Sequence, residues 1–204
     1  MTLRAVPVLV GLILGLAACT SDGSGSEPPA AAGSPTTSPA SSATRSSTPT
    51  PTPAPDLPAG CDAVLPFTDL DQALGRPLFG GSRYIVGVAQ PSIGRTGRVT
   101  CQYGVPTTGK GAAPLEVGMS TYKDAVSATD RVAATIAGLR SGATSQQAVT
   151  VAGQPTTVIG YKTGVTAVLA QGERTLAVSV SRSISDPGRA AQAVAEKVLA
   201  NWGR

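Results

Sequence analysis

Histidine is absent from all 204 residues of the sequence, and aromatic residues make up only 3% of it. Without histidine or a Cys-x-x-Cys spacing, the chain has no ligand set typical of zinc, so we expect no metal site. The scarcity of aromatic side chains leaves few positions on which bases could stack, which argues against nucleic acid as a partner. We also find no motif that would hold a cofactor and expect none.

The apolar run at residues 5–16 is too short to cross a membrane. A helix that spans a bilayer needs about 20 residues. The run follows a positively charged start that includes Arg4, and small residues come after it. This order is typical of a signal peptide that is removed, and we assign residues 1–18 to it.

The four residues that end this segment, Leu16-Ala17-Ala18-Cys19, resemble the lipobox of bacterial lipoproteins. The resemblance implies cleavage before Cys19 and a diacylglycerol on its thiol. Two or three acyl chains together hold a protein stably at a membrane surface. We therefore expect a lipid-anchored protein on the extracytoplasmic face of the cell membrane. The alternative is an ordinary secreted protein in which Cys19 has no special role.

Residues 19–60 consist mainly of Ser, Thr, Pro, Ala and Gly. Such a segment has too little apolar bulk to offset the entropy that it would lose on ordering. We expect a disordered tether that is stiffened toward polyproline II near its proline-rich end. Residues 61–204 follow as one extracytoplasmic globular domain, for which 144 residues is an ordinary length.

Two cysteines remain once Cys19 carries lipid. Cys61 and Cys101 form an even pair in an oxidising compartment, which favours a disulfide. Closing a loop of about 41 residues stabilises a chain by about 4 kcal/mol in the chain-entropy model. Two free thiols with a metal or redox task are the competing interpretation.

Hydrophobic spacing predicts helices at both ends and in the middle of the domain. Thr68 caps a short helix at residues 69–74, and Asp186 with Pro187 opens a closing helix whose apolar stripe ends at Trp202. A middle helix is predicted at residues 123–140. Its expected buried face consists of Val126, Val132, Ala133, Ile136 and Leu139.

Short alternating runs separated by turn residues predict strands. The ranges are 115–120, 146–151, 155–161, 165–170 and 175–181, with 84–88 and 99–103 as further candidates. Strands joined by tight turns, with helices before and after them, indicate the α+β class. We expect an antiparallel sheet of about five to six strands, with the N-terminal, middle and C-terminal helices packed on one face.

Several short motifs together resemble the actinobacterial lipoproteins that are grouped as domains of unknown function. Besides the lipobox and the tether, they are the start Cys61-Asp62-Ala63-Val64-Leu65, the helix end Leu74-Gly75, the strand Cys101-Gln102-Tyr103 and the turn Val151-Ala152-Gly153. The resemblance implies a disulfide and a surface location, and it carries no catalytic residue. Some small lipoproteins that this group resembles are sensor-like or partner-binding modules.

Two motifs match those of penicillin-binding proteins and β-lactamases. Ser120-Thr121-Tyr122-Lys123 fits S-x-x-K, with Ser120 as the nucleophile and Lys123 lowering its proton affinity, and Lys162-Thr163-Gly164 fits K-T-G. Only 38 residues separate the two motifs, and no Ser-Asp-Asn lies between them. We expect no enzyme, and a serine acyl-enzyme is the third interpretation.

The segment between Asp71 and Glu116 contains no acidic residue. Its basic residues are Arg76, Arg83, Arg95, Arg98 and Lys110. These five are our candidate contacts for an anionic lipid headgroup, a wall polymer or an acidic partner. The alternative is a solvated surface that is balanced by carboxylates from elsewhere in a domain of about +5, with 14 basic and nine acidic side chains.

The first interpretation is therefore a non-enzymatic, sensor-like binding module of the cell envelope, attached to the membrane through Cys19. Its ligand would be an envelope protein, a wall polymer or a lipid. The alternative is a carrier for a hydrophobic ligand or a lipid, which would need a cavity between the sheet and a helix.

Overall fold

The computed structural model describes residues 54, 56–108 and 111–202. The predicted signal peptide, Cys19, most of the predicted tether and Lys110 lie outside the described residues. In the part of the chain that is described, no helix combines the length and the apolar character that crossing a membrane requires.

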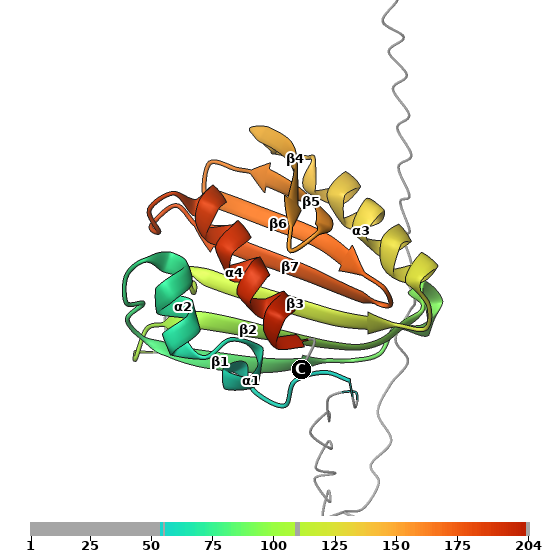
Figure 1. Cartoon of the computed structure of the whole chain (residues 1–204), viewed down its shortest axis with the longest axis horizontal. Coiled ribbons are helices and arrows are strands. Elements are labelled where there is room, and N and C mark those ends of the chain that lie inside the picture. Colours follow the sequence, from blue (N-terminus) through green and yellow to red (C-terminus); the bar gives the residue numbers. More distant parts are fainter. Residues whose placement is uncertain (1–53, 55, 109–110, 203–204) are drawn as a thin grey trace, which may run out of the picture. The chain divides into compact units, whose positions relative to one another are not determined.

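A single antiparallel sheet of seven strands organises the domain (Figure 1). The strands are β1 (Gly81–Gly87), β2 (Arg95–Val105), β3 (Leu115–Tyr122), β4 (Ser145–Val151), β5 (Gln154–Gly160), β6 (Gly164–Gln171) and β7 (Arg174–Ser181). Their order across the sheet is β1-β2-β3-β7-β6-β5-β4. Two meanders therefore meet in the middle, where β3 pairs with β7.

Four α-helices and one 3-10 turn complete the fold. They are α1 (Cys61–Val64), α2 (Phe67–Leu74), η1 (Pro91–Ile93), α3 (Ala125–Leu139) and α4 (Pro187–Trp202). The α+β class and the antiparallel sheet are confirmed. The strand number is seven rather than five to six because both further candidate ranges form strands, as parts of β1 and β2.

α4 lies across one face of the sheet, which we call the α4 face (Figure 1). Its predicted stripe is buried from Ala191 to Leu199 and packs with Val117, Val178 and Val180 of the sheet in one apolar core. Burying a side chain such as valine or leucine stabilises a fold by about 1.5–3 kcal/mol. Leu57, which precedes the first helix, is buried in the same core.

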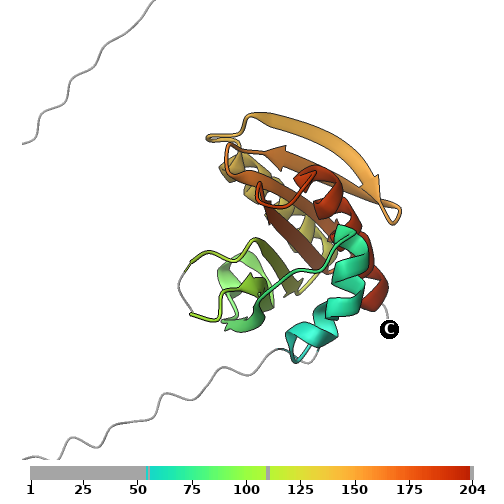
Figure 2. The ribbon, with the colours of Figure 1, turned by 90° about the vertical axis from the view of Figure 1, so that its left-hand side faces the viewer.

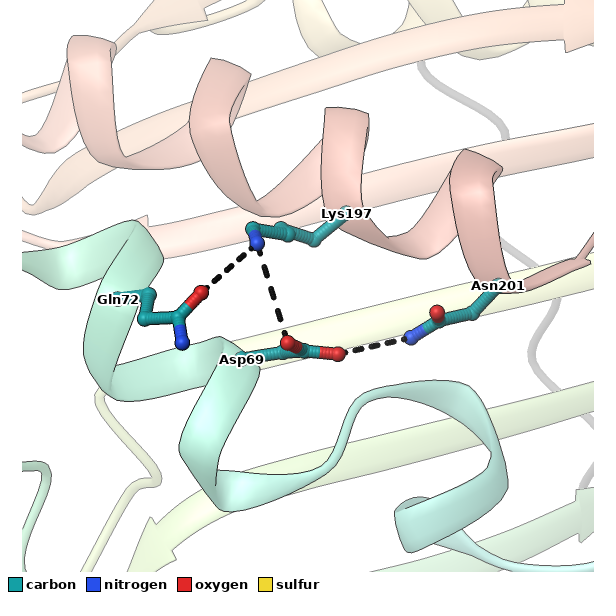
Figure 3. A network of polar contacts seen from close by, with 4 residues as sticks. All are labelled: Asp69, Gln72, Lys197 and Asn201. Atoms are coloured by element: carbon teal, nitrogen blue, oxygen red, sulfur yellow. Dashed lines mark hydrogen bonds and ion pairs between the residues drawn. The ribbon is translucent and has the colours of Figure 1, made fainter.

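Polar contacts fasten α2 to α4 (Figure 3). The Lys197 ammonium donates a hydrogen bond of 2.9 Å to Gln72 and lies 3.8 Å from the Asp69 carboxylate. Asn201 approaches the other oxygen of Asp69 at 3.5 Å. These contacts hold the short helix beside α4 on the same face of the sheet.

α3 lies on the opposite face of the sheet, which we call the α3 face (Figure 2). Val132 and Thr135 of α3 approach Ser120 and Ala177, which alternate along their strands with residues of the α4 face. The expectation that all helices share one face is therefore wrong for the middle helix. α1, α2 and α4 already cover the α4 face, so α3 packs on the other side.

The apolar face of α3 also differs from the prediction. Val126 is 69% exposed and Ala133 is exposed, whereas Ala128 is fully buried. Val132, Ile136 and Leu139 are partly buried, as a helix that only partly covers its sheet allows. This loose cover leaves space between α3 and the strands.

The predicted disulfide is present between Cys61 at the start of α1 and Cys101 in β2. The Cα atoms lie 5.5 Å apart, which is the usual separation for such a bond. Both cysteines are buried in the core of the α4 face. The bond attaches the beginning of the folded domain to an inner strand of the sheet.

Candidate functional site

A small cavity lies between α3 and the α3 face of the sheet, and three arginines line it. Its volume is about 110 Å³. One water needs about 10–15 Å³ of such space, so the cavity has room for several waters or for a small anionic group. We call it the arginine cavity. Its polar lining consists of Arg95, Arg98, Ser120, Tyr122, Arg131, Thr135 and Thr175.

A β-bulge brings two of the arginines to the same face. Residues three apart in a regular strand point to opposite faces, so Arg95 and Arg98 would normally diverge. The pairing of β2 with β3 shifts here: Arg95 lies opposite Tyr122, whereas Gly97 lies opposite Thr121. The extra residue re-aims Arg95, as bulges commonly do, so that both arginines line the cavity.

The floor of the cavity is low because β3 carries glycine at position 118. A Cβ atom built on Gly118 would lie 3.9 Å from Nη2 of Arg98. The guanidinium of Arg98 therefore extends from β2 over the neighbouring strand. A larger side chain at position 118 would occupy the space that the arginine and the cavity now share.

The third arginine comes from the helix above the sheet. Arg131 lies in α3, which begins after Asp124, and the Asp124 carboxylate accepts a 2.6 Å hydrogen bond from the Ser127 backbone N–H. This hydrogen bond is the main cause that lowers the pKa of Asp124. The capped helix start fixes where α3 crosses the strands and hence where Arg131 meets the cavity.

No carboxylate in the described residues neutralises the three arginines by an ion pair. The two ion pairs found there join Lys123 to Asp124 and Lys197 to Asp69. Glu116, also on the α3 face, is hydrogen-bonded to Gln102 at 3.0 Å. The three arginines therefore share the cavity without an ion pair to a carboxylate of the described residues.

The surroundings of the cavity change the pKa and the hydrogen bonding of Arg95. Burial first, and then the positive charge of Arg98, lowers its pKa from the ordinary value; Arg131 acts in the same direction and Tyr122 opposes it. One Nη of Arg95 donates to the Val88 carbonyl at 3.2 Å. Its Nε is buried and has no hydrogen-bond partner among the described residues. An unpaired buried donor destabilises a fold, so this Nε is a cost of placing Arg95 beside the cavity.

The structure brings together two of the five predicted basic contacts. Arg76 follows α2 and donates to the Ser183 carbonyl at 3.1 Å, away from the cavity lining. Arg83 lies exposed on the edge strand β1. Lys110 lies outside the described residues. Arg131 lies outside the segment without acidic residues, so that sequence pattern does not identify it.

The two β-lactamase-like motifs lie far apart. Ser120 pairs with Thr175, whereas Gly164 of the K-T-G motif pairs with Ser181. These partners are six residues apart on β7, or about 20 Å along the strand. Ser120 also lies within β3 and not at a helix start, and Lys123 is exposed beside Asp124. The arrangement does not assemble an acyl-serine site from these motifs.

Larger hollows lie at the surface. One of about 330 Å³ also has Arg131 in its lining, together with Lys123, Ser127 and Asp130 among others. Another, of about 450 Å³, lies beside Glu116, Thr166 and Ser179. Within the described residues, no group of three or more His, Cys, Asp or Glu side chains could hold a metal ion.

No family model and no curated protein matches the sequence. Among solved structures, the chain is similar to the extracellular domain of PknH from Mycobacterium tuberculosis, known from a crystal structure. The alignment covers 71% of this chain and 95% of that domain, with 12% sequence identity and a TM-score of 0.41.

Proposed function

We propose that this protein is a lipid-anchored module on the extracytoplasmic side of the membrane that binds an anionic ligand without chemically changing it. The observation that carries the proposal is the convergence of Arg95, Arg98 and Arg131 on one cavity without a neutralising carboxylate in the described residues. Partly buried like charges destabilise one another, and a bound anion reverses that effect.

The proposed location has separate support. The resemblance of Leu16-Ala17-Ala18-Cys19 to a lipobox supports anchoring through Cys19. The Cys61–Cys101 disulfide suits an oxidising compartment, since such bonds are rare in the cytosol. The composition of residues 19–60 suits a spacer between the membrane and the domain.

Binding is tested by thermal unfolding of the full chain in inorganic phosphate, sulfate or succinate, each compared with sodium chloride of equal ionic strength. A ligand that binds only the folded state raises the unfolding midpoint. We expect at least one anion to do so for the wild type and for the doubly substituted Arg182→Gln/Arg189→Gln, whose two arginines are exposed and lie outside the cavity lining.

The matched variant Arg98→Gln/Arg131→Gln loses the same total charge but empties the cavity of two arginines. We expect that none of the three anions raises the unfolding midpoint of this variant above its value in sodium chloride. An equal response of the two double variants would show that binding does not involve the cavity. The proposal is also wrong if none of the three anions stabilises the wild type.

The anchor is tested separately by feeding cells an alkyne-tagged palmitate. The wild type should carry the label and sediment with membranes, whereas Cys19→Ala should lose the label. A Cys19→Ala protein that still carries lipid would contradict anchoring at this residue and leave the binding test unaffected.

A further inference from the structure

We propose that the arginine cavity takes a phosphate monoester group in its dianionic form. This inference rests on the proposed function and narrows its ligand to one chemical class. It follows from the charge of the cavity, from the directions of its donors and from its size.

The charge of the site favours a dianion. Three arginine side chains line one cavity of about 110 Å³, and no carboxylate of the described residues forms an ion pair with them. A carboxylate or a phosphate diester would bring one negative charge. A phosphate monoester brings about −1.5 to −2 at pH 7, because its second pKa is about 6. In a partly buried site this extra charge is screened less than in water.

The donors approach from more directions than a planar anion could use. Arg95 and Arg98 come from β2, and Arg131 comes from the helix on the other side of the cavity. The Ser120 and Thr175 residues add hydroxyl groups from β3 and β7. A single arginine fork already satisfies both oxygens of a carboxylate. A tetrahedral monoester offers three terminal oxygens, enough for one contact to each of the three guanidinium groups that line the cavity.

The cavity is large enough for the phosphate group but too small for the whole ligand. The cavity has room for the phosphate but little for its organic substituent. The hollow of about 330 Å³ that also has Arg131 in its lining would receive that substituent beside Lys123, Ser127 and Asp130. The ligand class is therefore a phosphate monoester whose substituent carries polar groups or extends into solvent.

The test compares methyl phosphate with dimethyl phosphate by calorimetry, using the full chain with Cys19→Ala so that no acyl chain interferes. We expect methyl phosphate to bind at least tenfold more tightly. Arg98→Gln or Arg131→Gln should each weaken its binding by about tenfold or more, as loss of a hydrogen bond between charged groups does. Arg182→Gln is the control and should leave the affinity unchanged.

The pH dependence provides a second readout. The charged and titratable groups that face the site are Arg95 and Arg98 from β2, Tyr122 and Lys123 from β3 and its end, and Asp130 and Arg131 from α3. The chain has no histidine, the side chain whose ordinary pKa lies between pH 5 and 8. A several-fold gain in methyl phosphate affinity from pH 5 to pH 7.5 would therefore report the second ionisation of the ligand.

Binding to vesicles shows whether the phosphate monoester belongs to a lipid headgroup or to a soluble molecule. Phosphatidic acid presents a monoester headgroup and phosphatidylglycerol a diester. Binding of the Cys19→Ala protein to phosphatidic acid vesicles alone, lost in Arg98→Gln, would support the inference with a lipid as the ligand. Binding of methyl phosphate without such a vesicle preference would support it with a soluble ligand.

Equal affinity for the two methyl esters, or methyl phosphate binding that survives both arginine substitutions, would overturn the inference. If sulfate or succinate still stabilised the wild type through the cavity, the proposed anion-binding function would stand and only its narrowing to phosphate would fail.

Discussion

The phenol of Tyr103 donates a hydrogen bond of 2.8 Å to the main-chain carbonyl of Cys61, whose side chain is joined to Cys101 two residues before Tyr103. A covalent bond and a hydrogen bond thus connect Cys61, at the start of α1, to two positions of β2 that are two residues apart on the same face. Burial, with the nearby negative charge of Asp62, raises the pKa of Tyr103 above its ordinary value, so the phenol keeps its proton well into the alkaline range.

Replacing Tyr103 by phenylalanine tests the hydrogen bond. The Cys61 carbonyl also accepts from the Leu65 backbone N–H, so it would not be left without a partner. We expect Tyr103→Phe to lower the free energy of unfolding by about 1 kcal/mol in guanidinium titrations. Tyr161→Phe, which loses a hydrogen bond to Leu139 in a less buried place, should cost less. An unchanged free energy of unfolding in Tyr103→Phe would show that the hydrogen bond adds nothing to stability.

Removing the disulfide should lower the free energy of unfolding by more than Tyr103→Phe does. It closes a loop between residues 40 positions apart, for which chain entropy predicts about 4 kcal/mol. We expect the double variant Cys61→Ala/Cys101→Ala and the reduced wild type to lose similar amounts, as measured by chemical unfolding with and without dithiothreitol. A wild type whose unfolding is insensitive to the reductant, with free thiols confirmed by mass, would contradict this stabilising role.

Gly118→Val should separate folding from binding. A Cβ at this position contacts nothing closer than 3.9 Å, and a β-branched residue suits a strand better than glycine does. We expect the ligand-free unfolding midpoint to stay the same or rise, while the shift produced by the binding anion disappears. Gly118→Ala should retain part of that shift. Full anion stabilisation of the valine variant would place the binding site away from the cavity floor.

The cap of α3 should make stability depend on acidic pH. Because the hydrogen bond from Ser127 lowers the folded-state pKa of Asp124, its carboxylate contributes stability above its unfolded pKa of about 4 and loses it as the pH falls through the folded value. Asp124→Asn keeps a capping oxygen but does not titrate. The difference in thermal midpoint between the two proteins should narrow below about pH 4. A difference in thermal midpoint that stays constant from pH 7 to pH 2.5 would show that the Asp124 carboxylate adds no stability through its charge.

The elements with strong local patterns could be predicted from the sequence. The stripe of α4 is regular enough to identify its buried face, and the alternation in β7 identifies which residues point to the core. The side of the sheet on which α3 packs could not be predicted. Its pattern is weak, since only Ala128 is fully buried, and the choice of face depends on how α1, α2 and α4 fill the other side.

The candidate site was predicted only in part for a similar reason. The lack of acidic residues between Asp71 and Glu116 pointed to Arg95 and Arg98. A regular strand would have separated them, and only the bulge beside Gly97 places them together. Arg131 lies more than thirty residues later in a helix, and no local pattern connects it to the strand that it faces.

If the protein is anchored through Cys19 as proposed, the disulfide also determines how mechanical load would enter the domain. A pull on the tether would first meet Leu57, which is buried in the core, and then Cys61 at the start of a helix of only four residues. Without the cross-link, that short helix could peel from the sheet one contact at a time. With it, tension passes through a covalent bond to Cys101 in β2, which is hydrogen-bonded to β1 on one side and β3 on the other. The strand that takes up this tension is the one that carries Arg95 and Arg98, so strain on the tether would be felt at the site proposed to hold the ligand.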